Sequence, residues 1–359
     1  MSGELFVGLM SGTSLDGIDA VLVDFSGASP VVLRHVHHGF EPSLREALLE
    51  LQAPGSDELE RGAECANRLA HAYARAVAAT RADAAVQAIG CHGQTVRHRP
   101  DSGYTLQLGN AALLAELTRN RVISDFRSRD VAAGGQGAPL VPAFHAAVFG
   151  NRSESRVVLN LGGIANLSWL PATGDVRGFD TGPGNCLMDL WASRHLGRPF
   201  DDRGAWAAGG RLDAALLDAM LAEPYFAKPP PKSTGRDLFN AAWLDRHLSS
   251  RVAPKDVQST LLQLTTTSAA EAIRRHCAGA ARLIACGGGV ANAHLMQSLA
   301  EALAPLPVES SARFGLEPTA VEASAFAWLA REALAGRPGN VPSVTGARGP
   351  RVLGAIYPP

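Results

Sequence analysis

The sequence of 359 residues has few lysines and no pair of cysteines with metal-ligand spacing. Its cysteines are scattered and odd in number, and none forms a CxxC motif: Cys65, Cys91, Cys186, Cys277 and Cys286. This pattern supports neither a disulfide framework nor a zinc site, and we expect reduced thiols. Lysine occurs only at positions 228, 232 and 255. The binding of any anion must therefore rest on arginine, on backbone N–H groups or on a metal.

Targeting and membrane signals are also missing. The chain does not begin with a basic segment followed by an apolar one, and no apolar run reaches the length of a membrane span. The formal net charge of -1 predicts no general attraction to nucleic acid or to acidic membranes. We therefore expect a soluble cytoplasmic protein that binds neither.

Four common catalytic signatures are absent as well: GxxxxGK[ST], a complete GxGxxG, GxSxG and HExxH. Their absence argues against the P-loop, Rossmann, serine-hydrolase and zincin classes. The composition is 46% hydrophobic and 19% charged, which indicates a packed globular protein. A chain of this length exceeds the usual size of one core, so two domains are expected.

The most informative stretch is residues 157–185, VVLNLGGIANLSWLPATGDVRGFDTGPGN. Two apolar strands are predicted on either side of Gly162-Gly163, where the missing side chains let a backbone approach a bulky group. A third strand is expected to end at Asp180, because Thr181-Gly182-Pro183-Gly184 predicts a turn. A carboxylate at this position suits catalysis, but Asp180 as the N-cap of a helix over 186–195 is an equally good interpretation.

Residues 5–25, LFVGLMSGTSLDGIDAVLVDF, repeat this layout of strand, glycine-rich bend and strand. Such a bend can direct several N–H groups at a phosphate, and Asp16 and Asp19 could hold a metal through water. A plain hairpin with a polar tip is the alternative. Because a similar unit occurs early in each half of the chain, we predict a duplicated architecture.

Strands and helices alternate over residues 57–126, which predicts a mainly parallel α/β sheet with ligand-facing groups at strand ends. His92 follows one such strand and is interpreted as a substrate contact or a hydrogen-bonded structural group. Arg127, Arg129 and Asp130 precede the glycine-rich loop 134–137, and this arrangement suits either oxyanion recognition or a solvated surface.

Three further segments stand out in the second half. Residues 228–240, KPPPKSTGRDLFN, form a stiff loop that could act as a lid or as a linker. A strand over 281–286 leads into Gly287-Gly288-Gly289 and then a helix, a junction that brings backbone close to a flat or anionic group. A final amphipathic helix over 318–335 carries Glu322.

Taken together, these motifs resemble one family in order and over nearly the whole chain. They are GLMSGTSLDGID (8–19), CHGQTV (91–96), TLQLGN (105–110), DFRSRDVAAGGQGAPLVP (125–142), NLGGIANLS (160–168), GFDTGPGN (178–185), STGRDLFN (233–240) and CGGGVANAHLM (286–296). The family is the anhydro-N-acetylmuramic acid kinases, of the actin, Hsp70 and sugar-kinase superfamily. The resemblance implies an α/β fold of two duplicated actin-like, ribonuclease-H-like domains with an ATP cleft between them. We place the domains at 1–143 and 144–335, with 336–359 free to return to the first.

The resemblance also implies ATP and Mg²⁺ as cofactors. It assigns the first phosphate loop to residues 12–19, the second to the double glycine and the adenosine loop to the glycine triplet. The nucleotide-binding residues are then Gly12, Thr13, Ser14, Leu15, Asp16, Gly17, Ile18, Asp19, Gly162, Gly163, Gly287, Gly288 and Gly289. The superfamily often has Asp at the start of each phosphate loop, but here Leu9-Met10 and Asn160 take those places. Metal ligands are therefore left unassigned.

The reaction implied is the conversion of ATP, water and 1,6-anhydro-N-acetylmuramic acid into N-acetylmuramic acid 6-phosphate and ADP, within cell-wall (peptidoglycan) sugar recycling. In the anhydro sugar O6 carries no proton, so a base, implied to be Asp180, should activate water to attack C1. The predicted substrate residues are His92, Gln94, Arg129, Asp130 and Glu322, with Arg129 assigned to the lactyl carboxylate. The resemblance further implies a homodimer.

Two rival interpretations are an ordinary sugar kinase that phosphorylates a free hydroxyl and, from another class, an ATP-gated binding or filament protein. The second is disfavoured because we see no polymer-contact insertion or appended peptide-binding domain.

Overall fold

The computed structural model describes residues 3–12, 14–248 and 252–359. The predicted nucleotide-binding residue Thr13 lies outside these ranges. The chain divides into two compact units, unit 1 (Met1–Val148 and Thr319–Pro359) and unit 2 (Phe149–Pro318). Residues 319–335, which we predicted in the second domain, therefore belong to unit 1 together with the C-terminal segment. No helix in the described part of the chain is long and apolar enough to cross a membrane.

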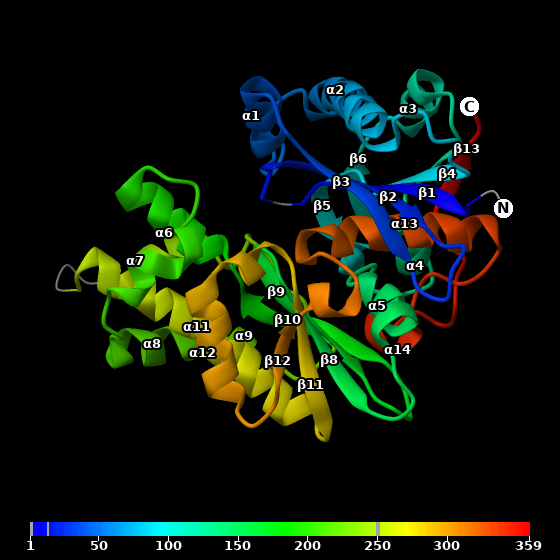
Figure 1. Ribbon diagram of the computed structural model, residues 1–359. Coiled ribbons are helices and arrows are strands. Elements are labelled where there is room, and N and C mark those ends of the chain that lie inside the picture. The colour runs from blue at the N-terminus through cyan, green and yellow to red at the C-terminus, as the bar shows by residue number, and fades with distance from the viewer. Residues whose placement is uncertain (1–2, 13, 249–251) are drawn as a thin grey trace. The chain divides into compact units, whose positions relative to one another are not determined.

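Unit 1 contains a six-stranded sheet of order β13-β7-β4-β1-β2-β3 (Figure 1). The strands are β1 (Leu5–Met10), β2 (Gly17–Asp24), β3 (Val31–Gly39), β4 (Ala88–Cys91), β7 (Val122–Ser124) and β13 (Ala355–Tyr357). A separate hairpin consists of β5 (Gln94–Arg99) and β6 (Tyr104–Leu108). The helices are α1 (Pro42–Glu50), α2 (Glu58–Arg81), α3 (Ala111–Thr118), α4 (Ser128–Ala132), α5 (Val141–Phe149), α13 (Val321–Leu334) and α14 (Pro342–Thr345).

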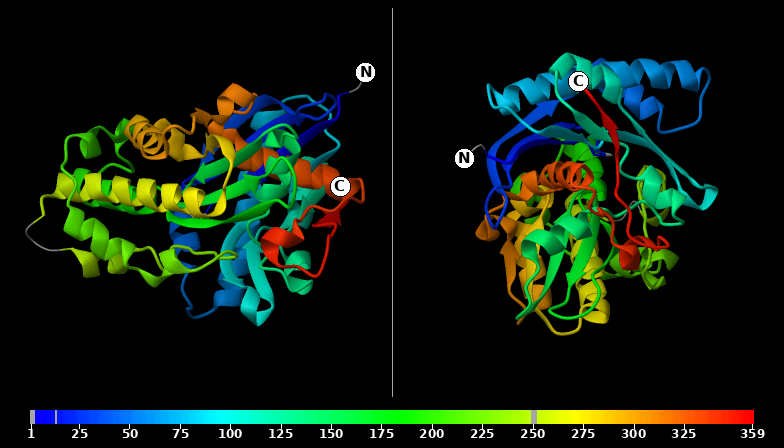
Figure 2. Two further views of the ribbon diagram at one scale, coloured as in Figure 1. Left: turned by 90° about the horizontal axis from the view of Figure 1, so that it is seen from below. Right: turned by 90° about the vertical axis from the view of Figure 1, so that its right-hand side faces the viewer.

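The alternation of side chains along β1 explains why helices cover both faces of this sheet. Val7 and Leu9 join a core with α1, α2 and α3, whereas Phe6 joins a second core with α13. The right-hand view of Figure 2 shows α2 and α13 on opposite sides of the sheet. A Cβ atom on Gly8 would lie 1.9 Å from the carbonyl oxygen of Ala323. Glycine therefore lets α13 pack directly on the strand, which places 319–335 in this unit.

Unit 2 contains a five-stranded sheet of order β10-β9-β8-β11-β12. The strands are β8 (Ser155–Leu161), β9 (Ile164–Leu170), β10 (Arg177–Pro183), β11 (Ala280–Cys286) and β12 (Val308–Ser310). The helices are α6 (Cys186–Leu196), α7 (Ala205–Ala208), α8 (Ala214–Leu221), α9 (Pro224–Ala227), α10 (Ala241–His247), α11 (Pro254–His276) and α12 (Ala293–Leu303). Figure 1 shows α11 and α12 side by side on this sheet.

One face of this sheet is apolar, because alternate residues of each strand join a single core. Val157, Leu159 and Leu161 of β8 pack there with buried residues of α6, α11 and α12. The intervening residues face the opposite side, and they include Asn160 and Asn166. The helix-covered face thus holds the core, while the opposite face, here called the polar face, carries Asn160 and Asn166 beside buried apolar residues such as Val158.

The two sheets share one topology. In each sheet, the first three strands in sequence form an antiparallel meander. The fourth strand pairs parallel with the first, and the fifth pairs parallel with the fourth. This repeated ribonuclease-H-like arrangement confirms the predicted duplication and the α/β class. The prediction of mainly parallel pairing was wrong, since hairpins form one side of both sheets.

Candidate active site

Two glycine-rich segments meet at one edge of the unit 2 sheet. Gly162-Gly163 follow β8, and Gly287–Gly289 follow β11, which pairs parallel with β8 so that Cys286 lies opposite Asn160. A Cβ atom on Gly287 would lie 2.3 Å from Oδ1 of Asn160, so only glycine permits this approach. Gly287 also has a φ of 84°, a left-handed value that favours glycine. The predicted second phosphate loop and adenosine loop are therefore neighbours.

The turn after β10 fixes the conformation of the double glycine. Asn185 donates its backbone N–H to the carbonyl of Gly162 over 2.8 Å, and the N–H groups of Gly184 and Cys186 go to the carbonyl of Gly163 over 3.0 and 3.1 Å. The C=O and N–H of one trans peptide point in opposite directions. The N–H groups of Gly163 and Ile164 therefore point away from this turn, as a phosphate-binding bend requires.

Asp180 lies inside β10, on the polar face of the sheet. Our expectation that the strand ends there was wrong: β10 continues to Pro183 through a register shift between Asp180 and Gly182. The strand register places Asp180 opposite Asn166, and Asn166 opposite Asn160. Three polar side chains thus form a row across neighbouring strands, and side chains paired in this way lie about 5 Å apart at Cβ. The N-cap interpretation fails for Asp180, because α6 begins at Cys186 after Asn185.

The proline-rich loop 228–240 holds Asp180 in place. Thr234 donates its backbone N–H to Oδ2 of the carboxylate over 2.9 Å. The N–H of Asp180 donates to the carbonyl of Lys232 over 3.2 Å. The hydroxyl of Tyr225 donates to the carbonyl of Asp180 over 2.6 Å. Both the main chain and the side chain of Asp180 are therefore fixed by residues more than forty positions further along the chain.

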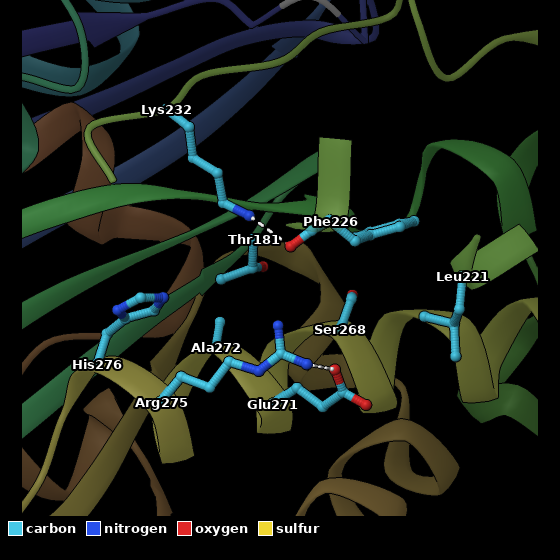
Figure 3. Close-up of a pocket in the computed structure, with 9 residues that line it drawn as sticks. All are labelled: Thr181, Leu221, Phe226, Lys232, Ser268, Glu271, Ala272, Arg275 and His276. Atoms are coloured by element: carbon cyan, nitrogen blue, oxygen red, sulfur yellow. Dashed lines mark hydrogen bonds and ion pairs between the residues drawn. The ribbon is translucent and has the colours of Figure 1, made fainter. Parts of the chain in front are cut away.

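A small pocket lies on the other face of β10, behind Asp180. Its lining includes Thr181, Lys232, Ser268 and Arg275 (Figure 3). Lys232 donates to the carbonyls of Tyr225 and Phe226, and Arg275 pairs with Glu271. Burial lowers the pKa of Lys232, as does the charge of Arg275. Because its cations are engaged by protein groups, we interpret this pocket as support for the loop.

Burial, followed by the charge of Asp180, raises the pKa of the Tyr225 phenol well above its usual value. Tyr225 therefore remains a hydrogen-bond donor at any physiological pH. The hydroxyl donates to the main-chain carbonyl of Asp180, so it positions the backbone of this residue.

Unit 1 contains the first glycine-rich bend. Gln94 donates to the carbonyl of Gly12 over 3.0 Å, and Leu15, with a left-handed φ of 55°, donates its N–H back to Gly12 over 3.2 Å. Ser14 donates its hydroxyl to the carboxylate of Asp16 over 2.7 Å. Gln94 thus supports the bend itself, which had not been part of its predicted role.

His92 connects this bend to Arg127. Arg127 donates through Nε to Nε2 of His92 over 3.1 Å, and the other ring nitrogen lies 3.3 Å from the carbonyl of Ser11. Burial, with the Arg127 charge second, lowers the pKa of His92 to about 3. The ring is therefore neutral at physiological pH, with a proton on Nδ1 and an acceptor at Nε2. This arrangement matches the structural role that the sequence left open for His92.

The other predicted residues of unit 1 lie on different helices and strands of this unit. Asp19 contacts His35 and His37 of β3 at 3.1 Å each, and Ile18 is buried in the core. Arg129 is exposed on α4. Glu322 lies in the first turn of α13, where an acidic side chain complements the helix dipole.

Asp130 is fully buried and its carboxylate is occupied. It accepts hydrogen bonds from the N–H of Gly137 over 2.8 Å, from Nδ2 of Asn340 over 2.6 Å and from the hydroxyl of Thr345 over 2.8 Å. It therefore fastens the glycine-rich loop to the C-terminal segment.

Sequence reasoning missed Tyr225, Thr234 and Asn166. Thr234 lies in the loop 228–240 that the sequence singled out, and Asn166 interrupts an apolar strand beside the double glycine, whereas Tyr225 had no signal. In the described residues there is no group of three or more His, Cys, Asp or Glu side chains that could hold a metal ion.

The chain matches the family model "Anhydro-N-acetylmuramic acid kinase" over residues 4–359. It is 55% identical to the anhydro-N-acetylmuramic acid kinase of Cupriavidus pinatubonensis over 370 residues, covering 99% of both chains. It is 57% identical to that of Burkholderia vietnamiensis over 369 residues, covering 99% of this chain and 96% of the relative.

Proposed function

Because the chain belongs to the anhydro-N-acetylmuramic acid kinase family, we propose that it converts 1,6-anhydro-N-acetylmuramic acid, ATP and water into N-acetylmuramic acid 6-phosphate and ADP. The observation that supports this most is the position of Asp180. Its carboxylate lies on the polar face of the unit 2 sheet and is held by the N–H of Thr234. A carboxylate fixed in this way suits a general base, because no conformational search precedes proton transfer.

The chemistry follows from the structure of the acceptor. O6 is bonded to C1 in the anhydro sugar, so it has no proton that a base could remove. Asp180 takes a proton from water, the water oxygen bonds to C1, and the C1–O6 bond breaks. O6 then bonds to the γ-phosphorus as the bond to the β-phosphate oxygen breaks and ADP leaves. The proton of the water is released from Asp180 afterwards, so the atoms and charges balance.

The nucleotide-binding residues that we propose are those of the glycine-rich segments. In unit 2 the N–H groups of Gly163 and Ile164 would face phosphate oxygens, and Gly287–Gly289 would pack against the adenosine. In unit 1 the bend over residues 12–19 would bind phosphate in the same way.

The donor atoms present fit a magnesium ion that arrives with the nucleotide. Mg²⁺ prefers phosphate and water oxygens and needs only one or two carboxylates. Asp16, at the first bend, would hold it through water, whereas the carboxylate of Asp19 already contacts two histidines. When bound, the ion would neutralise charge on the phosphates.

The product distinguishes this function from an ordinary sugar kinase. Purified protein is incubated with ATP, Mg²⁺ and the anhydro sugar, and the product mass is measured. We expect the sugar to gain one phosphoryl group and one water. A gain of the phosphoryl group alone would mean that a free hydroxyl is phosphorylated and the ring stays closed. ATP hydrolysis without any sugar product would favour an ATP-gated binding protein.

We also propose that the protein acts in the cytoplasm as a homodimer in peptidoglycan sugar recycling. Light scattering on the purified protein tests the dimer: a mass near 75 kDa supports it, about twice the 37.5 kDa of one chain, and the monomer mass contradicts it.

A further inference from the structure

Arg236 brings a positive charge to the double glycine. A Cβ atom built on Gly163 would lie 3.7 Å from Nη2 and 3.9 Å from Nε of Arg236, so the guanidinium is in contact distance of this bend. Its charge also reaches the start of α6: burial raises the pKa of the Cys186 thiol to about 12, and Arg236 acts against that rise. The arginine comes from the loop 228–240 and not from the sheet.

The backbone of Arg236 is anchored while its side chain is not engaged. Nδ2 of Asn240 donates to the carbonyl of Arg236 over 3.1 Å. Over residues 3–12, 14–248 and 252–359, the guanidinium has no hydrogen bond or ion pair. Two other arginines of unit 2 are paired instead: Arg194 with Asp245, and Arg282 with Glu154 and Glu309.

Within the described part of the chain, an arginine side chain with no protein partner and the outward-pointing N–H groups of Gly163 and Ile164 thus occur at one bend. Arginine is suited to oxyanions because its planar fork of donors matches phosphate and carboxylate geometry. The same loop fixes the predicted base, since Thr234 is only two residues before Arg236. A single segment therefore carries both the N–H that holds Asp180 and the charge at the phosphate bend.

We propose that Arg236 binds the γ-phosphoryl group of ATP and stabilises the charge on it during transfer to O6. This inference rests on the proposed function. Because the loop contacts both Asp180 and the bend, the arginine also couples the position of the base to the presence of the triphosphate. The alternative anion is the lactyl carboxylate of the sugar, and the experiment separates the two sources.

The test compares Arg236→Ala, Arg236→Lys and wild type by calorimetry with Mg²⁺ and either ADP or a non-hydrolysable ATP analogue. We expect Arg236→Ala to weaken binding of the analogue at least about tenfold and to leave ADP binding within about twofold, because only the analogue carries a γ-phosphate. Arg236→Lys, which keeps the charge, should lose less. Arg246→Ala, at an exposed arginine of α10, is the matched control and should bind both nucleotides as the wild type does.

Kinetics supply the second readout. Contacts of arginine with a transferred phosphoryl group are worth about 10³-fold or more in kcat in related chemistry. We expect kcat of Arg236→Ala to fall by roughly that factor with a smaller change in the KM of the sugar. Unchanged analogue binding and kcat would overturn the proposal. Weaker binding of the sugar with unchanged nucleotide binding would also overturn it and assign the arginine to the carboxylate. The nucleotide measurements need no sugar, so they remain valid if the acceptor is a different one.

Discussion

Thr234 donates its backbone N–H to Oδ2 of Asp180 over 2.9 Å, although the two residues are 54 positions apart. The hydrogen bond orients one carboxylate oxygen by a main-chain N–H, which among side-chain changes only a change to proline removes. The loop is itself supported from behind by Lys232, whose ammonium is bound by two carbonyls. The catalytic carboxylate that we propose is therefore positioned by a loop, and loop changes should alter catalysis.

Replacing Thr234 with proline removes this N–H while Thr234→Ala retains it. A hydrogen bond to a charged group contributes about 1.5–3 kcal/mol. We expect Thr234→Pro to lower kcat by roughly 10- to 100-fold, because the carboxylate loses its fixed orientation, whereas Thr234→Ala stays near wild type. Steady-state kinetics with the anhydro sugar make the comparison. Equal loss in the two variants would show that the side chain matters and not the N–H.

Two buried histidines of unit 1 make the free energy of unfolding decrease at acidic pH. Burial, and for His92 also Arg127, lowers the folded-state pKa of His92 and His145 to about 3 each. Below about pH 6.5 the unfolded chain takes up protons that the folded chain does not. The part of the unfolding free energy that depends on these two histidines is therefore fully present above about pH 6.5. It falls toward pH 3 by about 1.4 kcal/mol per pH unit for each histidine.

Urea unfolding between pH 7 and pH 4 measures this slope. His92→Gln keeps a polar side chain without a titrating group, so the variant should lose stability less steeply than wild type. His71→Gln changes an exposed histidine on α2 and serves as the control. A slope unchanged by His92→Gln would mean that His92 is protonated in the folded protein.

Asp130 was predicted as a substrate residue, yet its carboxylate is satisfied inside unit 1. Asp130→Ala leaves the N–H of Gly137 and the donors of Asn340 and Thr345 without their acceptor. We expect a loss of about 3 kcal/mol or more in unfolding free energy, because each buried donor left unpaired costs about 1–3 kcal/mol. The folded fraction should keep the wild-type KM for the sugar. A raised KM with unchanged stability would restore the substrate role.

Glycine at position 184 is required by the close approach of two turns. A Cβ there would lie 2.2 Å from the carbonyl oxygen of Gly162 and would displace the double-glycine bend, which we propose binds phosphate. We expect Gly184→Ala to weaken nucleotide binding at least about tenfold. Gly209→Ala, where no atom lies closer than 3.6 Å to the new Cβ, should bind normally. Calorimetry with ADP compares them, and normal binding by both would show that the bend tolerates displacement.

The glycine-rich bends could be predicted because glycine determines which backbone conformations are accessible at its own position. The strand register that aligns Asp180, Asn166 and Asn160 could not be predicted, although each of the three residues lies in a predicted strand. The contacts of Tyr225 and Thr234 could not, because they join segments 45 and 54 residues apart through a loop whose path depends on tertiary packing. The assignment of α13 to unit 1 failed for the same reason. Its packing on Gly8 is a long-range contact, and the signal in the sequence was only an amphipathic helix.

The predicted strand end at Asp180 was wrong for a different reason. Thr181-Gly182-Pro183-Gly184 has the composition of a turn, but the register shift at Gly182, together with pairing to β9, extends the strand to Pro183. Pairing energy from the neighbouring strand overrides local preference here. Asp180 therefore faces the polar side of a sheet, and this gives it neighbours that a turn would not.

The most direct test of Asp180 as the base is the fate of the water oxygen. The reaction is run in H₂¹⁸O with ATP and the anhydro sugar, and with N-acetylmuramic acid 6-phosphate as the control for exchange at C1. Wild type should place one ¹⁸O on the sugar and none on the transferred phosphoryl group. Asp180→Asn should form this product about 10²- to 10⁴-fold more slowly, and Asp218→Asn, at an exposed position of α8, should form it at the wild-type rate. Label on the phosphoryl group, or a wild-type rate for Asp180→Asn, would contradict the account.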